Sequence, residues 1–251
     1  MVNAGAPLAA VPVVILAGGR GERLAPHTDE LPKALLPVGD SSLLEHLLTH
    51  LGTEGFRRAH LLLSHLGKLI EERCGDGEPF RLELEFWRDE RMLSTAGALG
   101  VLPRMECTFC VVNGDVLTDL DFTEMLKAHR RQHAVATVAV QQQPTQLEFG
   151  VVTADTDGRL VDLVEKPILE HRISLGMHLF EPAALDFLEP GEVLSMPDFL
   201  LRLRDAGQAV FVYETDCLWL DVGRPEDYEH ARRIVREGGL ARSSGRASNS
   251  A

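Results

Sequence analysis

The first half of the chain alternates short apolar segments with longer segments of helical periodicity. The apolar segments, each of strand length, are 13–17, 59–64, 107–115 and 134–140. Between them, leucines at 43, 44, 47, 48 and 51 recur as on one face of a helix, and 66–77 and 121–133 also have helical patterns. Alternation in 81–87 predicts a half-exposed strand, and 95–103 resembles the opening of a helix. This rhythm predicts a parallel sheet with helices on both faces.

From Phe149 onward the pattern predicts consecutive strands. Residues 149–155, 159–165 and 172–180 read as strands, and Asp155–Gly158 supplies a hairpin turn between the first two. Further along, the sequence predicts helices at 182–188 and 197–206, strands at 209–214 and 217–222, and a final helix from Pro225.

The expected fold class is therefore α/β, Rossmann-like, with a mostly parallel central sheet and a small β-rich insertion in the second half. Residues 1–237 are expected to form a single domain with two halves, 12–147 and 148–237. Residues 238–251 are small and polar, and we expect them to be a disordered tail. No hexapeptide repeat occurs, so no solenoid is expected.

The composition and the net charge limit the kinds of molecule that the protein is expected to bind. A net charge of −13 over 251 residues disfavours a nucleic-acid or anionic membrane surface, although a few local cations can still hold a small anionic substrate. The apolar segment 7–17 lacks a basic lead-in and is too short to span a bilayer. Cys107 and Cys110 fall in an expected strand, where residues three apart face opposite ways, which disfavours a redox pair. These features predict a cytoplasmic protein with reduced cysteines.

A glycine-rich segment follows the first expected strand directly. Glycines 18, 19 and 21 allow backbone N–H groups to approach a phosphate closely. Their spacing does not fit the P-loop pattern, and Leu24 stands where the dinucleotide-binding fingerprint needs its third glycine. Neither of these two common nucleotide motifs is present.

The whole segment from Leu16 to Lys33 fills the pattern L-A-G-G-x-G-x-R-L-x-P-x-T-x-x-x-P-K. Later blocks follow in a matching order, namely NGD at 113–115, FGVV from 149, VEKP at 164–167 and WLDVGRPEDY at 219–228. Across residues 12 to 235 the chain resembles the nucleoside-diphosphate-sugar pyrophosphorylases, and it is most similar to short mannose-1-phosphate and heptose-1-phosphate guanylyltransferases. The resemblance makes the first half the nucleotide-binding half and the second the sugar-binding half.

The resemblance implies attack by a sugar 1-phosphate on the α-phosphorus of a nucleoside triphosphate, with pyrophosphate leaving. Because the nucleophile is already an anion, charge neutralisation and positioning matter more than a general base. Arg23 and Lys33 are the implied catalytic cations. The residues implied to hold the nucleotide are Leu16, Ala17, Gly18, Gly19, Gly21, Thr95 and Gly97.

The resemblance also implies Mg²⁺ as cofactor, held by Asp115 and Asp221, whose oxygens suit this ion. Nearby Asp119 and Asp121 read instead as a turn residue and a helix N-cap. The implied sugar-phosphate-binding residues are Gly150, Glu165, Lys166 and Gly176.

Departures from the family pattern leave the sugar and the base open. Ser174 stands where many members have Asn, and His178, where many have Tyr, reads as a packed strand residue. The loop 92–99 resembles a base-recognition loop that favours GTP, although Ser94 replaces its first glycine.

Several alternatives stay open from the sequence. They are thymidylyl, uridylyl or adenylyl transfer to glucose 1-phosphate or a cyclitol phosphate, a glycosyltransferase using Asp119–Asp121 as its metal motif, and a non-catalytic sugar-nucleotide sensor. The implied partners are a nucleoside triphosphate and a sugar 1-phosphate, with no nucleic acid and no membrane. A homodimer also stays open.

Overall fold

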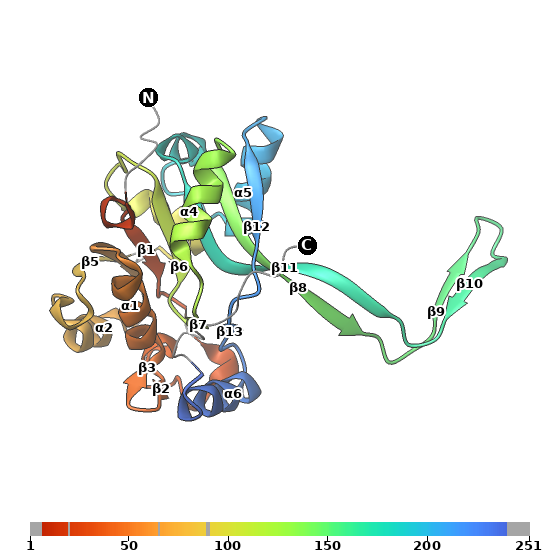
Figure 1. Ribbon diagram of the computed structural model, residues 1–251, viewed down its shortest axis with the longest axis horizontal. Helices are drawn as coiled ribbons and strands as arrows, with labels where there is room; N and C mark the ends of the chain where they lie inside the picture. Colours follow the sequence, from red (N-terminus) through yellow and green to blue (C-terminus); the bar gives the residue numbers. More distant parts are fainter. Residues whose placement is uncertain (1–6, 20, 65, 89–90, 240–251) are drawn as a thin grey trace.

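A seven-stranded sheet forms the centre of the computed structural model, which describes residues 7–19, 21–64, 66–88 and 91–239. Its strand order is β12-β8-β11-β6-β1-β4-β5 (Figure 1). The strands of this sheet are β1 Val13–Leu16, β4 Arg58–Leu63, β5 Glu83–Arg88, β6 Phe109–Asn113, β8 Ala136–Gln146, β11 Ile168–Phe180 and β12 Val210–Glu214. Only β11 runs antiparallel to its neighbours, so the predicted mostly parallel sheet is confirmed.

The central strand β1 shows why the sheet is buried on both faces. It pairs in parallel with β4 and with β6, so that Val13 lies opposite both Ala59 and Cys110. Val13 and Ile15 face one buried hydrophobic cluster, while Val14 between them faces another. A continuous apolar run is what a strand covered on both sides requires.

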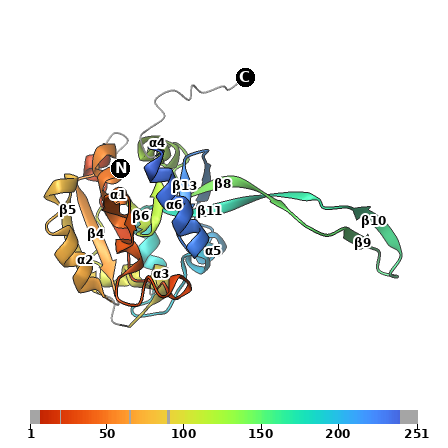
Figure 2. The same cartoon turned by 90° about the horizontal axis from the view of Figure 1, so that it is seen from below.

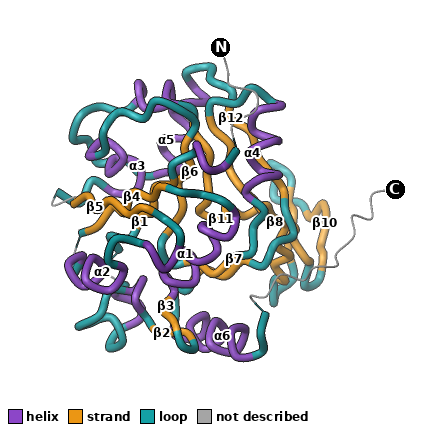
Figure 3. Tube along the Cα trace, turned by 60° about the vertical axis from the view of Figure 1, so that its left-hand side comes forward, coloured by secondary structure: helices purple, strands orange, loops and turns teal. Residues whose placement is uncertain are grey.

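Helices supply the cover. The helices are α1 Leu43–Glu54, α2 Gly67–Cys74, α3 Ser94–Gly97, α4 Phe122–Arg131, α5 Met196–Asp205 and α6 Pro225–Arg236. Residues of α1, α2 and α4 contribute to the first cluster, and residues of α3 and α5 to the second. Helices therefore cover both faces, as the sequence predicted (Figure 3).

Local signals account for the helix boundaries. The hydroxyl of Ser42 accepts a hydrogen bond from the Glu45 backbone N–H, and the Glu45 carboxylate accepts one from the Ser42 N–H, which together form a capping box for α1. Asp121 caps α4, as expected, because its carboxylate accepts a hydrogen bond from the Glu124 N–H at 3.0 Å. The predicted helix at 95–103 is a single α turn followed by the 3₁₀ turn Ala98–Val101, and that at 182–188 is the 3₁₀ helix Pro182–Phe187.

A small layer brings the end of the domain next to its beginning. The strand β13 Trp219–Asp221 pairs antiparallel with β7 Val116–Thr118, and a further pair joins β2 Pro37–Val38 to β3 Ser41–Ser42. Tyr228 of α6 donates a hydrogen bond from its hydroxyl to the Pro37 carbonyl at 2.7 Å. The segment containing β13 is therefore fixed beside the segment 33–43.

Two long strands leave the body of the molecule and form an arm. β8 and β11 pair from Ala136↔Phe180 out to Gln146↔Ile168, and β9 Val151–Ala154 with β10 Leu160–Val164 forms a second hairpin at the far end. The arm, residues 141–173, projects well away from the sheet in both views (Figures 1 and 2). The β-rich insertion was predicted, but β8 and β11 extend past the predicted strands because their outer residues pair through the backbone without any apolar alternation.

The remaining expectations concern the cysteines and the chain ends. All four cysteines are free, and β6 begins only at Phe109, so Cys107 precedes the strand and is exposed whereas Cys110 is buried. No helix among the described residues combines the length and apolar content needed to cross a membrane. Residues 240–251 of the predicted disordered tail lie outside the described residues.

We expect Gly52→Ala to destabilise the protein although alanine is the better helix former by about 1 kcal/mol. A Cβ atom at this position of α1 would collide with the Phe80 carbonyl oxygen, so the backbone of 78–81 would have to move. We expect a loss of about 1–3 kcal/mol in the free energy of unfolding, measured by urea denaturation. Gly100→Ala is the matched control, because a Cβ there meets nothing within 4 Å; equal stability of the two variants would contradict the clash.

Candidate active site

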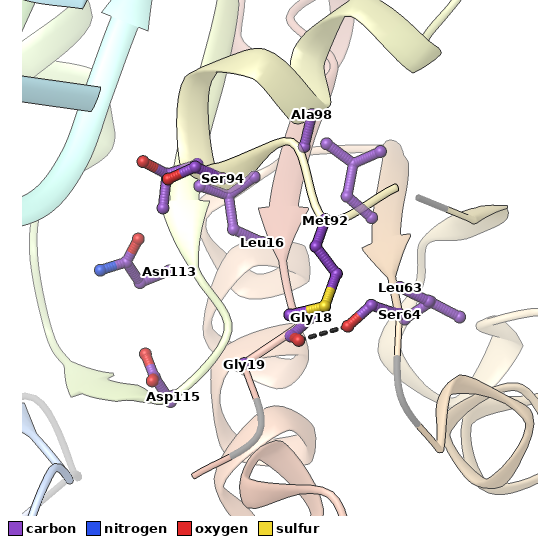
Figure 4. A pocket seen from close by; sticks show the side chains of 12 residues that line it. Leu16, Gly18, Gly19, Leu63, Ser64, Met92, Ser94, Ala98, Asn113 and Asp115 are labelled. Atoms are coloured by element: carbon purple, nitrogen blue, oxygen red, sulfur yellow. Dashed lines mark hydrogen bonds between the residues drawn. The ribbon is translucent and has the colours of Figure 1, made fainter. Parts of the chain in front are cut away.

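The candidate site begins where three neighbouring strands end. β6, β1 and β4 are adjacent and parallel, and their carboxyl ends place Asn113, Leu16 and Ser64 around one cavity of about 470 Å³ (Figure 4). The chain passes from β1 to β4 on one side, while β6 lies on the other, so this is the point where the strand order reverses. Open α/β sheets bind ligands at such a point, and the volume suits a small molecule.

The glycine loop closes one side of this cavity. Ser64 donates a hydrogen bond from its hydroxyl to the Gly18 carbonyl, which ties the loop to the end of β4. A Cβ at Gly18 would lie 3.0 Å from that hydroxyl, whereas a Cβ at Gly19 would meet nothing within 4 Å. Gly18 is therefore required for close packing, and Gly19 leaves the backbone open to the cavity that both residues line.

Gly21 redirects the loop toward Lys33. Its φ of +67° is a left-handed conformation, and a Cβ there would lie 2.9 Å from Thr28 Cγ2 and 3.1 Å from Lys33 Cβ. The Thr28 hydroxyl donates to the Gly21 carbonyl at 2.9 Å and holds the turn. The predicted signature thus packs against itself, with its first and last parts in contact.

Lys33 forms the charged centre of the site. Its side chain is 11% exposed, and its Nζ lies 2.6 Å from Asp115 Oδ2 and 3.5 Å from Asp221 Oδ1. Asp115 follows β6 and Asp221 ends β13, so segments far apart in sequence meet at one ammonium group. The backbone fixes the pair as well, since the Val222 N–H donates to the Asp115 carbonyl at 3.3 Å.

The two carboxylates affect each other through charge. Burial and the negative charge of Asp115 raise the pKa of Asp221 above its ordinary value, and the cations Lys33 and Arg23 oppose that rise. Arg23 belongs to the same cluster, because a Cβ at Gly223 would lie 3.5 Å from both Arg23 Nη2 and Asp221 Oδ2. Both predicted catalytic cations and both predicted metal ligands are therefore gathered at one place.

The charged cluster adjoins the cavity at Asp115. This residue lines the cavity and also forms an ion pair with Lys33 in the cluster. The opposite wall comes from the loop 92–98, where Ser94, Thr95 and Ala98 line the cavity. Ser94 has a φ of +67°, so it keeps the backbone conformation that a glycine would adopt without strain. The site therefore joins an apolar cavity to a cluster of two carboxylates and two cations.

Comparison with known proteins places this geometry in a family. The nucleotidyl transferase family model matches residues 12–238. The chain belongs to that family.

Curated relatives of this nucleotidyl transferase carry different substrate names. A UTP–glucose-1-phosphate uridylyltransferase of Synechocystis is 32% identical over 88% of this chain, and a mannose-1-phosphate guanylyltransferase of Mycobacterium tuberculosis is 32% identical over 87%. Each match spans 62% of the relative's own length.

Solved structures share the fold. A putative glucose-1-phosphate thymidylyltransferase from Bacillus anthracis superposes with a TM-score of 0.72 at 22% identity, covering 90% of this chain and 96% of that one. HddC from Yersinia pseudotuberculosis gives 0.68 at 22% identity, covering 90% and 99%.

Two predicted nucleotide-binding residues have structural tasks in this fold. The Thr95 hydroxyl accepts a hydrogen bond from the Met196 N–H at 2.7 Å, which anchors the start of α5. Gly97 packs against the segment 192–194, because a Cβ there would overlap the Glu192 carbonyl. Thr95 also lines the cavity, whereas Gly97 is absent from its lining, so direct contact between Gly97 and a nucleotide stays a prediction.

The predicted sugar-binding residues divide into two groups. Gly176, with φ +69°, lies at the bulge in β11 directly against the Asn113 side chain, beside the cavity. Gly150, Glu165 and Lys166 lie on the arm, where Gly150 and Glu165 are neighbours. The arm carries them away from the charged cluster of their own chain (Figure 1). Within a single chain, the four predicted sugar-phosphate-binding residues therefore do not lie at one site.

His178 is placed inside the sheet, as its sequence context indicated. It is buried between Val111 and Val138 and stacks on Phe180 with ring centroids 5.9 Å apart. Burial lowers the pKa of His178 to about 4, so the imidazole is neutral at physiological pH. His178 therefore has a packing role within the sheet.

The cavity-lining residues that sequence reasoning missed include Ser64, Met92 and Asn113, besides Leu62 and Leu63. Ser64 and Asn113 each stand at the carboxyl end of a parallel strand, a position that predicts a ligand contact once the strand order is known. The strand order itself cannot be read from the sequence. Met92 lies in the loop that was assigned to base recognition, and only its side-chain direction was unpredictable.

We expect Lys33→Met to raise the pKa of Asp221 further, because the Lys33 ammonium favours the ionised carboxylate. Carboxyl-carbon NMR titration measures this shift. In Lys68→Met, which removes an exposed lysine paired with Glu72, the Asp221 titration should match the wild type. An unchanged or lowered pKa in Lys33→Met would contradict the arrangement.

Proposed function

We propose that this nucleotidyl transferase transfers a nucleoside monophosphate from a nucleoside triphosphate to a sugar 1-phosphate and releases pyrophosphate. The observation that carries the proposal is the contact of Lys33 with both Asp115 and Asp221 at the mouth of the strand-end cavity. The apolar cavity fits a base and ribose, and the adjoining charges fit the phosphates. Names of the relatives support the same class of reaction.

The chemistry explains why cations gather here. An oxygen of the sugar phosphate forms a new bond to the α-phosphorus while the bond from the α-phosphorus to the bridging oxygen of pyrophosphate breaks, and both reactants are anions. Lys33 and Arg23 offset their repulsion and the charge that develops on the leaving group. Since the nucleophile is already ionised, the neutral, buried His178 is not needed as a base.

Mg²⁺ is the proposed cofactor, and the site's donor set fits it. Among the residues that the structure describes, no group of three or more metal-ligating side chains occurs, but Mg²⁺ usually takes only one or two carboxylates and keeps several waters. Asp115 and Asp221 would hold it. Bound there, the ion would neutralise phosphate charge and help to orient the two substrates.

GTP and a mannose or heptose 1-phosphate are the proposed substrates. The loop 92–99 supports guanine through its resemblance to guanylyltransferase loops, and the Mycobacterium tuberculosis relative bears a guanylyltransferase name. The Synechocystis relative bears a uridylyltransferase name, so UTP is the main competitor.

The hydrogen bonds of Asp119 and Asp121 argue against a glycosyltransferase. Asp119 accepts a hydrogen bond from the Leu218 N–H at 2.6 Å, and Asp121 caps α4. These carboxylates have structural partners, as expected for a turn residue and an N-cap, and Asp115 is left as the strand-end acid. A non-catalytic sensor would have no need for all four of Arg23, Lys33, Asp115 and Asp221.

Pyrophosphate release tests the proposal directly. The protein is incubated with Mg²⁺, each common nucleoside triphosphate in turn, and mannose, glucose or heptose 1-phosphate. We expect release to require both substrates and to be fastest with GTP. Nucleotide binding by a folded protein without release in any combination would favour the sensor, and release fastest with UTP would overturn the guanylyl assignment.

Lys33→Ala and Asp115→Ala should each lower kcat about 10²–10³-fold, because each removes a preorganised charge at the reacting phosphates. Lys68→Ala, at an exposed surface ion pair, is the matched control and should keep wild-type turnover. Circular dichroism checks that the fold is retained. Turnover within a few-fold of wild type in either site variant would remove that residue from the mechanism.

A further inference from the structure

The end of the arm exposes a concentration of large apolar side chains. Phe149 is 81% exposed and stands at the start of the terminal hairpin. The other exposed apolar residues of the arm are Val151, Val152, Leu160, Val161, Leu163, Val164, Ile168 and Leu169. An apolar surface of this extent on a projecting element indicates a binding surface.

The terminal hairpin also lacks support of its own. Val152 pairs with Leu163 on one face and Val151 with Val164 on the other, and all four are exposed. A two-stranded hairpin without a layer packed on it is marginally stable in water. Both faces of the hairpin therefore gain by burial against another surface.

The stem of the arm keeps this hairpin away from its own site. Its root is fixed to the body, since Arg172 Nε donates to Glu214 Oε2 at 2.9 Å and Gln141 Nε2 donates to the Cys217 carbonyl at 3.2 Å. Beyond the root the ladder is unbroken from Gln141↔Ile173 to Gln146↔Ile168. Five residue steps at ~3.4 Å each carry the strand roughly 17 Å outward before the hairpin begins.

The site of a single chain is open on the side where the sugar is expected. The side chains of Asp115 and Asp221 are 28% and 45% exposed, and the arm that bears Glu165 and Lys166 projects away from the body of its own chain (Figure 2). The outer arm, residues 147–171, carries six carboxylates against two cations, Arg159 and Lys166. The opening carries charges of both signs, since Arg23 and Lys33 lie beside Asp115, Asp221 and Asp227.

We propose that the arm docks on a second copy of this chain and completes that copy's active site with Glu165 and Lys166. The arm of each protomer crosses to the other protomer. A single two-fold axis therefore buries both arms and completes both active sites, and the assembly closes as a dimer. A second copy of this chain is a better partner than an unrelated protein because of what the arm carries. Glu165 and Lys166 are predicted site residues, yet the fold holds them away from the charged cluster of their own chain. The shared-site part of this inference rests on the proposed function, and the dimer does not.

Solution mass tests the interface without any assay of turnover. Size-exclusion chromatography with light scattering should give twice the 27.6 kDa of one chain for the wild type. The double variant Val152→Asp/Leu163→Asp places two charges on one face of the hairpin and should give the monomer mass. Val193→Asp is the matched control, because Val193 is 71% exposed on the body, and it should remain dimeric. Circular dichroism should be unchanged in both, which shows that the body of each variant is folded.

Mixing two impaired variants tests the shared site. Lys33→Ala retains an intact arm, and Glu165→Ala/Lys166→Ala retains an intact charged cluster. After equal mixing and exchange of subunits, half of the dimers are mixed and one of their two sites is whole, so about a quarter of wild-type turnover should return. An arm that serves its own chain predicts no recovery above the average of the two variants.

The outcomes separate the two ideas. A monomeric wild type, or a dimer that survives Val152→Asp/Leu163→Asp, overturns the arm interface whatever the activity. An arm-dependent dimer without recovery on mixing, or with full turnover by Glu165→Ala/Lys166→Ala alone, overturns the shared site. A wild type that dimerises through the arm but turns over no substrate counts against the proposed function and leaves the interface standing.

Discussion

The site depends on one ammonium group that holds two carboxylates together. Without Lys33, Asp115 and Asp221 would face each other with like charge in a partly buried setting, where repulsion is screened less than in water. Asp115 follows β6, Asp221 ends β13, and Lys33 begins a 3₁₀ turn, so the same contact joins the central sheet, the small C-terminal layer and the glycine loop. The packing of Gly21 against Lys33 extends this contact to the loop that faces the cavity. The contacts of Lys33 thus offset the repulsion between the two carboxylates and join three parts of the fold at the same place.

Most of the body could be predicted because its signals are local. The leucine spacing of α1, its capping box and the apolar run of β1 each depend on a few neighbouring residues. The strand order could not be predicted, because it depends on which parallel strands meet in space. For the same reason Ser64 and Asn113 were missed, although each occupies a strand end that a known order would have marked.

The arm shows a different limit of sequence reasoning. The residues from Gln141 to Gln146 have no alternation of polar and apolar side chains, so they carry no strand signal, and they are strands because each pairs with β11 through the backbone. The block VEKP matched its family pattern as well as the other blocks did, yet its place in the fold is set by the stem and not by the block itself. A motif can therefore identify chemistry while leaving open which site it serves.

The stem also constrains how this protein can change over time. On β8 its side chains, residues 142–146, face solvent, so almost any residue that tolerates an extended backbone can replace them at little cost. Its length is not free in the same way, because adding one residue to each strand turns the terminal hairpin over, while adding two restores its facing and displaces it by about 7 Å. The stem should therefore tolerate many changes of residue type, whereas its length should change in steps of two residues per strand.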